Sequence, residues 1–126
     1  MSKVFTDVHI FMTAADQPVP SHNVKQNEQS DLYLKLIEEE YQELMDAVYE
    51  EDDTEICDAC FDLMWVIIGY MHSRGWDTEN IWDEGAQSNL AKIDRTSGKV
   101  LKRKDGKVMK PEGWRPPDFS KFVKSP

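Results

Sequence analysis

The sequence predicts an all-α helical bundle that ends in a small C-terminal β hairpin and an extended arm. Apolar residues recur at helical spacing over residues 30–51, 55–73 and 79–92. After residue 97, two short alternating segments flank an Asp-Gly pair, which indicates a hairpin. A chain of 126 residues forms one domain, with an N-terminal helix and loop (1–29), a helical part (30–93) and a basic hairpin with its arm (94–126).

The N-terminal segment combines one apolar stretch with a proline-containing loop. Residues 8–12 predict a short helix. Pro18 and Pro20 each fix φ and push the preceding residue away from helical geometry, so residues 17–22 are expected to be an extended loop.

The first long helix is expected over residues 30–51. Ser30 or Asp31 can cap its N-terminus. Four apolar residues at i, i+4, i+7 and i+11 predict a stripe that faces the core: Ile37, Tyr41, Leu44 and Val48.

The second long helix is expected over residues 55–73. Asp53 or Thr54 can cap its start, and Arg74-Gly75 marks its end. Residues 63–71 are apolar on every side, which is typical of a helix buried all round.

A third helix is expected over residues 79–92, with Asp77 or Thr78 as its cap. The hairpin then pairs residues 99–102 with 107–110. The remaining residues, 111–126, are expected to form an arm that packs on another surface or another subunit.

The charges are strongly segregated along the chain. Residues 1–91 hold four Lys/Arg and 20 Asp/Glu, a net charge of −16, whereas residues 92–126 hold 11 and four, a net charge of +7. An acidic body argues against binding a nucleic-acid duplex, which requires a basic face. It suits multivalent cations, and the basic segment suits phosphate groups. Alternatively, the tail neutralises the body, within the fold or in a dimer.

The remaining composition indicates a cytoplasmic protein. No apolar run is long enough for a membrane span, and the N-terminus lacks the features of a secretory signal. Cys57 and Cys60 are expected to be reduced helix residues. The three histidines are unclustered in sequence, so no histidine metal site is predicted: His9, His22 and His72.

Acidic residues recur at helical spacing on both long helices. The first carries Glu39, Glu40 and Glu43, and the second carries Glu55, Asp58 and Asp62. Asp62 is the most informative, because an ionised carboxylate at the entrance to the apolar run costs several kcal/mol unless it is paired. Protonation, a metal ion or a basic partner could compensate for it, the candidates being Lys35, Arg74 and Lys92.

Antiparallel packing across the short connection at residues 52–54 would bring the two acidic stripes face to face. Facing carboxylates cannot all stay ionised without cations, and their hard oxygen atoms select Mg²⁺ or Mn²⁺. The alternative is that the stripe at positions 39, 43, 46 and 50 is simply a solvated helix face.

These acidic residues also carry a family resemblance. Glu40-x-x-Glu43 followed by Asp58 and Asp62 resembles the all-α nucleotide pyrophosphohydrolases, which include MazG proteins, dimeric dUTPases and phosphoribosyl-ATP pyrophosphohydrolase. Their pattern is E-x-x-E followed by E-x-x-D, so the second half matches either Glu55-x-x-Asp58 or Asp58-x-x-x-Asp62, of which we favour the latter. Segments 17–20, 87–92 and 105–110 are similar to MazG-like proteins of phages and bacteria.

The resemblance implies hydrolysis of a nucleoside triphosphate between the α and β phosphates, which yields the monophosphate and pyrophosphate. Two or three Mg²⁺ or Mn²⁺ ions would be held by Glu40, Glu43, Asp58 and Asp62, with Glu55 and Glu39 as further candidate ligands. Glu39 would position or deprotonate the attacking water. The candidate phosphate contacts are Asn89, Lys92, Lys107 and Lys110.

The resemblance further implies a homodimer or homotetramer that controls the nucleotide pool. A purine of the guanine type is the first expectation for the base, with dUTP or another pyrimidine as the alternative. No base pocket is assigned, because Trp65, Tyr70 and Trp82 are aromatic residues at helical spacing, which are more often core. A non-catalytic interaction protein, whose acidic helices form a partner-binding surface, is the alternative from another functional class.

Overall fold

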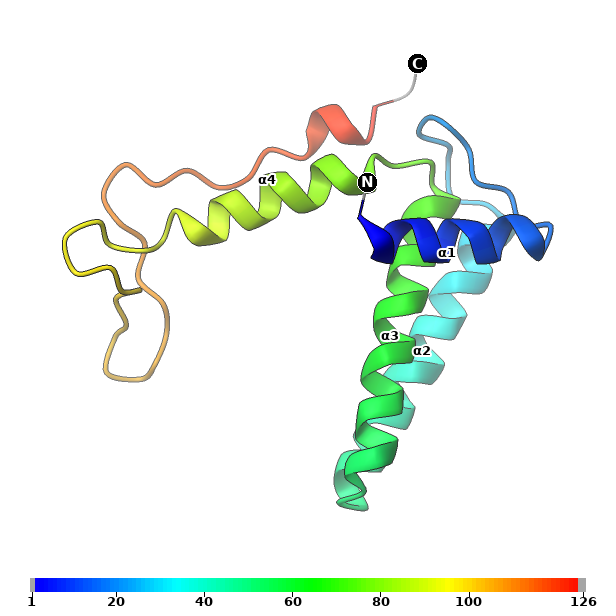
Figure 1. The fold of residues 1–126 in the computed structure, drawn as a ribbon, viewed down its shortest axis with the longest axis horizontal. Helices are drawn as coiled ribbons and strands as arrows, with labels where there is room; N and C mark the ends of the chain where they lie inside the picture. Colours follow the sequence, from blue (N-terminus) through cyan, green and yellow to red (C-terminus); the bar gives the residue numbers. More distant parts are fainter. Residues whose placement is uncertain (1, 125–126) are drawn as a thin grey trace.

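The computed structural model describes residues 2–124 and confirms the all-α class. Its elements are α1 (Lys3–Ala14), α2 (Glu28–Tyr49), α3 (Asp53–Ser73), α4 (Thr78–Leu90) and the short 3₁₀ helix η1 (Ser120–Phe122). The helices α2 and α3 form a long antiparallel pair, and α1 crosses one end of it (Figure 1). Helix α4 leads away from this pair, with the C-terminal segment running back along it (Figure 1). None of the described helices could cross a bilayer.

The core lies where α1 crosses α2 and α3. Val8 and Met12 of α1 are buried there with Tyr33 of α2 and Val66 of α3. Gly69 allows this packing, because a Cβ atom at that position would fall on the Tyr33 ring. The predicted short helix at residues 8–12 is therefore part of a longer helix, and its two ends, Val8 and Met12, are the buried residues of α1.

The N-terminus of α2 is capped by Asn27 and not by Ser30 or Asp31 as the sequence suggested. The Asn27 side chain accepts hydrogen bonds from the backbone N–H groups of Gln29 (2.9 Å) and Ser30 (3.1 Å). The Ser30 hydroxyl accepts one in return from the Asn27 N–H, at 2.8 Å. This reciprocal bonding satisfies two free donors, so the helix starts two residues earlier than expected.

The sequence predicted the N-terminal cap of α4 correctly but not that of α3. Asp52 caps α3 by accepting from the Glu55 N–H at 3.2 Å, so the prediction of Asp53 or Thr54 was wrong by one residue. Asp77 caps α4, as expected, by accepting from the Asn80 N–H at 3.3 Å. Glu51 adopts φ 56° and closes the turn between α2 and α3.

Two predictions of burial were wrong for the isolated chain. On α2, Tyr41 and Val48 are 54% and 50% exposed, although they belong to the predicted core stripe. On α3, Met64 and Ile67 are 59% and 43% exposed, although residues 63–71 were expected to be buried all round. The physical reason is that each helix of an antiparallel pair covers only one face of the other. A broad apolar surface is therefore left open.

The predicted C-terminal hairpin forms its turn but no strand among the described residues. The Gly106 N–H donates to the Arg103 carbonyl at 2.9 Å, as expected for a tight turn around Asp105-Gly106. The pairing in this region consists of two isolated antiparallel bridges, Ile93 with Val100 and Lys102 with Val108. Both arms are exposed, and an isolated two-stranded hairpin without packing is marginally stable.

The arm packs on α4, in agreement with the expectation that it covers another surface. The Trp114 indole N–H donates to the Ser88 carbonyl at 2.8 Å, and the Asp118 N–H donates to the Glu84 carboxylate at 3.0 Å. Together these contacts hold residues 111–122 along the helix (Figure 1).

His9 and His72, which are far apart in sequence, lie side by side where α1 crosses α3, with ring centroids 5.6 Å apart. The neutral His72 ring donates from Nε2 to the Phe5 carbonyl at 2.9 Å. Desolvation lowers the pKa of His72. This pair therefore joins two helices, and sequence proximity alone did not reveal it.

Candidate functional site

Three carboxylates converge between α2 and α3. One oxygen atom each of Glu40, Glu43 and Asp62 lies within 4.8 Å of the other two. Glu40 and Glu43 are three residues apart and so share one face of α2. The antiparallel course of α3 brings Asp62 level with them. We call these three residues the acidic cluster.

Glu40 is the most constrained member of the acidic cluster. Its Oε2 atom is buried and has no hydrogen-bond partner among the described residues. Desolvation, reinforced by the Glu43, Asp62 and Asp58 carboxylates, raises the pKa of Glu40 to about 7. Near pH 7, a large fraction of Glu40 is therefore protonated, and a bound cation would favour its ionised form.

Asp62 is half-buried on α3 and is subject to the same repulsion from neighbouring carboxylates. Desolvation raises its pKa, and the neighbouring Asp58 and Glu43 carboxylates raise it further. Asp58 is thus close enough to act on both Glu40 and Asp62, although it lies outside the acidic cluster as defined by distance.

No basic side chain of the described residues forms an ion pair with the acidic cluster. Arg74 donates instead to the Val24 carbonyl at 2.7 Å, and Lys92 donates to the Asn89 side chain at 3.1 Å. Over residues 2–124 both side-chain ion pairs are local, namely Lys3 with Asp7 and Arg103 with Asp105. The expected basic partners of Asp62 therefore do not compensate its charge.

The donor set of the acidic cluster fits a hard divalent cation. Mg²⁺ and Mn²⁺ prefer carboxylate oxygen atoms, and three of them converge here. A cation would also give the buried Glu40 Oε2 atom the partner that it lacks. Clusters of exposed acidic residues are common, but the buried and unpartnered oxygen of Glu40 distinguishes this one.

An acidic groove of about 360 Å³ continues from the acidic cluster towards the α2–α3 turn. Asp58 and Glu55 line it from α3. Asp46 and Glu50, which the sequence left as members of a solvated face, line it from α2. Glu55 is thus at the groove but outside the acidic cluster, and Glu39 is exposed and outside both.

The structure groups three of the four candidate phosphate contacts at the far end of α4. Lys92 bonds to Asn89, and its ammonium lies 5.2 Å from the centroid of the Trp114 ring. The Lys110 ammonium lies 4.7 Å from the same ring. We call Asn89, Lys92, Lys110 and Trp114 the basic cluster.

Lys107 is exposed, and the structure gives no contact of its side chain with the basic cluster. Trp114 was missed by the sequence analysis, because only the return of the arm along α4 brings it to the two lysines. A lone tryptophan in a segment rich in lysine was the available signal.

The aromatic residues considered for base stacking lie away from the acidic groove. Trp65 packs edge-on against Phe11, and Tyr70 packs edge-on against Trp76. Trp82 is 66% exposed on α4. None of these rings lines the groove, so the geometry assigns no base pocket to them.

A protein-family model matches most of the chain. The model of the family described as phosphoribosyl-ATP pyrophosphohydrolase matches residues 5–89. No individual curated protein matches significantly. The matched range contains the whole acidic cluster and groove and ends at Asn89, before the other residues of the basic cluster. This chain therefore belongs to the phosphoribosyl-ATP pyrophosphohydrolase family, whose members are generally metal-dependent hydrolases of acid anhydrides.

Proposed function

We propose that this protein hydrolyses a nucleoside or deoxynucleoside triphosphate at the α–β bond and releases the monophosphate and pyrophosphate. The observation that carries the proposal is the acidic cluster, in which Glu40, Glu43 and Asp62 converge without a basic partner and one buried oxygen stays unpaired. Family membership supports the type of bond that is cleaved.

Glu40, Glu43, Asp58 and Asp62 would hold two or three Mg²⁺ or Mn²⁺ ions, with Glu55 as an outer candidate. Such ions neutralise phosphate charge and lower the pKa of a water molecule. Activation of the attacking water and binding of the phosphates are assigned to side chains of the protein. The unpaired Glu40 oxygen supports its role as a ligand, and the groove supports that of Asp58.

Glu39 is proposed to orient the attacking water and accept its proton. Its carboxylate is exposed and next to Glu40 in sequence, but it is not one of the three converging groups. A carboxylate outside the ligand set does not use its oxygen atoms to hold a metal ion, so they stay free to accept a proton from water.

Asn89, Lys92 and Lys110 are proposed to bind the phosphates. The amide of Asn89 and the two lysine ammonium groups supply hydrogen-bond donors to the phosphate oxygen atoms. The ammonium groups also offset the negative charge of the pyrophosphate that is released. Lys107 is proposed as a weaker, outer contact from the exposed turn.

For the base, we propose a guanine-type purine first and dUTP or another pyrimidine second. The protein would act on free nucleotides in the cytoplasm, as a homodimer or homotetramer that controls the nucleotide pool. The open apolar surface on α2 and α3 supports an oligomer.

A panel of the common ribo- and deoxyribonucleoside triphosphates with Mg²⁺ tests the proposal, with substrate loss and products measured together. We expect equal amounts of monophosphate and pyrophosphate, and loss of activity on chelation or in Glu43→Gln. Release of orthophosphate from the intact enzyme would indicate a phosphatase instead. No turnover, together with Mg²⁺ binding that Glu43→Gln leaves unchanged, would favour the non-catalytic interaction protein.

A further inference from the structure

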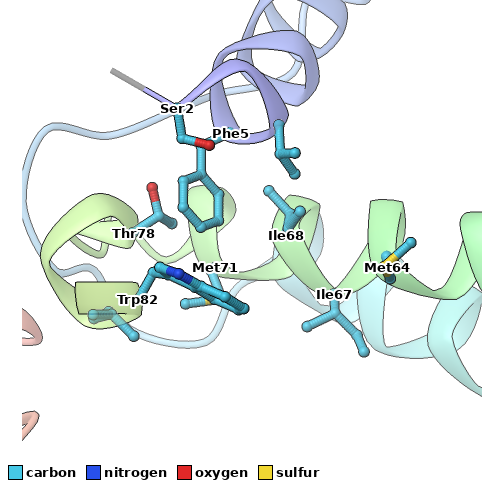
Figure 2. Close-up of a pocket in the computed structure, with 10 residues that line it drawn as sticks. Ser2, Phe5, Met64, Ile67, Ile68, Met71, Thr78 and Trp82 are labelled. Carbon is cyan, nitrogen blue, oxygen red and sulfur yellow. The ribbon is translucent and has the colours of Figure 1, made fainter. Parts of the chain in front are cut away.

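Trp114 lies outside the range that the family model matches, and its surroundings differ from those of an apolar packing residue. The matched range ends at residue 89. At the start of α4, Figure 2 shows the Trp82 ring among the apolar side chains that line a cavity of about 490 Å³, such as Phe5 and Met71. Beyond the other end of α4, the Trp114 ring instead has two ammonium groups over it. Its role is therefore electrostatic as well as apolar.

The last turn of α4 fixes the position of the Trp114 ring. The indole N–H donates to the Ser88 carbonyl at 2.8 Å. The usual helical donor to that carbonyl is the Lys92 N–H, which donates to the Asn89 carbonyl instead, at 3.1 Å. Within the arm, the Trp114 backbone N–H donates to the Pro111 carbonyl at 3.1 Å. The ring is therefore tied to the end of the helix that carries Asn89 and Lys92.

The Trp114 ring brings two like charges to one place. The ammonium groups of Lys92 and Lys110 lie 5.2 Å and 4.7 Å from its centroid, so they are at most about 10 Å apart, the sum of the two distances. They repel each other, but the negative face of the indole ring attracts both. Over residues 2–124, neither lysine forms an ion pair with a carboxylate. Both charges therefore stay available for an anion.

Asn89 adds a hydrogen-bond donor beside these two charges. Lys92 donates to its side-chain oxygen at 3.1 Å, so the NH₂ group is the part of the amide that can donate to a phosphate. A lysine side chain loses much rotamer freedom when its ammonium group binds a ligand, and a contact that already orders it reduces this loss. The ring and the amide therefore order the basic cluster before an anion arrives.

We propose that Trp114 is a positioning residue for phosphate binding: its ring orders Lys92 and Lys110, which in turn bind the phosphates of the substrate and of the pyrophosphate product. The inference rests on the proposed function and goes beyond it, because it makes the C-terminal arm a working part of the site. Trp114 contacts no reacting atom. Removal of its ring therefore weakens the binding of phosphate groups and leaves the chemical step unchanged.

Steady-state kinetics of Trp114→Leu test this role on the best substrate of the nucleotide panel. Loss of two exposed cation–π contacts should raise KM about 5- to 30-fold, while kcat stays within about twofold of wild type. Trp114→Phe keeps an aromatic face but lacks the N–H bond to Ser88, so it should recover part of the lost affinity. An unchanged KM in Trp114→Leu, or a decrease in kcat alone, would overturn the inference.

Phe119→Leu is the matched control for the docking of the arm. Phe119 belongs to the same arm, and its ring lies 3.5 Å from where a Cβ atom at Gly85 of α4 would be, outside the basic cluster. The change keeps an apolar contact with the helix and should leave KM close to wild type. Equal rises in KM for Phe119→Leu and Trp114→Leu would show that only the docking of the arm matters, and would overturn the role of the Trp114 ring.

A double-mutant cycle separates positioning from a general structural role. In the Lys92→Ala/Lys110→Ala protein, the ring has no ammonium group left to hold, so adding Trp114→Leu should cause no further decrease in kcat/KM. A structural role would persist there, and a decrease as large as in the wild-type protein would overturn the inference. Circular dichroism checks that each variant is folded, and Trp114→Met, which fills more of the space without a ring, replaces Trp114→Leu if the latter unfolds.

Binding of inorganic pyrophosphate gives a readout without turnover. Titration calorimetry with Mg²⁺ present should show that Trp114→Leu raises the Kd of pyrophosphate about 5- to 30-fold. Binding of Mg²⁺ alone should stay unchanged, because the acidic cluster is intact. An unchanged Kd of pyrophosphate would overturn the inference. Failure of the proposed function is distinct, because the wild-type protein would then hydrolyse no nucleotide, whereas normal turnover with an unaffected KM in Trp114→Leu would reject only the role of Trp114.

Discussion

Glu40 on α2 and Asp62 on α3 face each other across the helix pair, with carboxylate oxygens within 4.8 Å. The pKa of each is raised, chiefly by desolvation, and that of Glu40 reaches about 7. Carboxyl groups of this kind bind protons more tightly in the folded than in the unfolded protein. The contribution of these two groups to the stability of the metal-free protein is therefore complete below the ordinary carboxyl pKa values and is lost as the pH rises through about 7.

The first prediction follows from this relationship. Without divalent cations, the melting temperature of the wild-type protein relative to that of Glu40→Gln should decrease between pH 5 and pH 8, and Mg²⁺ at pH 8 should restore it. A hundredfold excess of Mg²⁺ over its Kd stabilises the fold by about 2.7 kcal/mol. Glu40→Gln should flatten the pH dependence and abolish the gain from Mg²⁺. Equal Mg²⁺ stabilisation of both proteins, measured by calorimetry, would contradict the metal site.

The second prediction concerns the ligands. Glu43→Gln keeps the size and polarity of the side chain but removes a charged oxygen from the acidic cluster. Even outer-shell changes cost about 10- to 100-fold at metal sites, so we expect a decrease in kcat/KM of at least about 100-fold. Glu38→Gln, an exposed neighbour on α2 outside the cluster, is the control and should stay close to wild type. Equal losses in the two variants would point to a general effect of charge.

The third prediction uses two glycines in helices. A Cβ atom at Gly69 would overlap the buried Tyr33 ring, so Gly69→Ala should destabilise the fold by about 1–3 kcal/mol or more. At Gly85, a Cβ atom would lie 3.5 Å from Phe119, which is ordinary contact. Gly85→Ala should therefore be neutral or stabilising by up to about 1 kcal/mol. Urea unfolding of both variants checks the contrast, and equal effects would show that α2 and α3 do not pack as described.

Much of the acidic site could be predicted from the sequence, because it depends on local periodicity and one short turn. The spacing of Glu40 and Glu43 places them on one helix face, and the three-residue connection fixes the register of Asp62 against them. The cap of α2 could not be predicted as easily. The side chains of Asn27 and Ser30 each accept a hydrogen bond from the backbone N–H of the other residue. Because both residue types are good N-caps, the sequence alone does not tell which of the two caps the helix.

The exposed face of α3 and the position of Trp114 depend on how the elements pack in three dimensions. The apolar pattern of residues 63–71 predicted burial all round, but packing of α3 against α1 and α2 leaves Met64 exposed in the single chain. Similarly, Trp114 meets Lys92 only because the arm returns along α4. Neither relationship leaves a periodic signal in the sequence.

The fourth prediction concerns His72, whose pKa is lowered mainly by desolvation. Besides the Phe5 carbonyl, the groups that act on it are His9, which lowers the pKa further, and Glu79, which raises it. A depressed pKa means that the unfolded state binds the proton more tightly. This contribution to stability is therefore complete above about pH 6.5 and is lost as the pH falls below it. His72→Gln should lose that dependence in calorimetric difference curves, whereas His22→Gln, at an exposed loop residue, should keep it.

The fifth prediction tests the open apolar face. Met64 is 59% exposed in the isolated chain, so Met64→Lys should have little effect on the stability of a monomer. In an oligomer that buries this face, the same change places an unpaired charge in an apolar interface, which costs several kcal/mol. Light scattering should then show dissociation towards the 14.6 kDa chain. Met64→Leu keeps the face apolar and should preserve the assembly. Retention of the wild-type mass by Met64→Lys would instead show that any contact between copies lies on another surface.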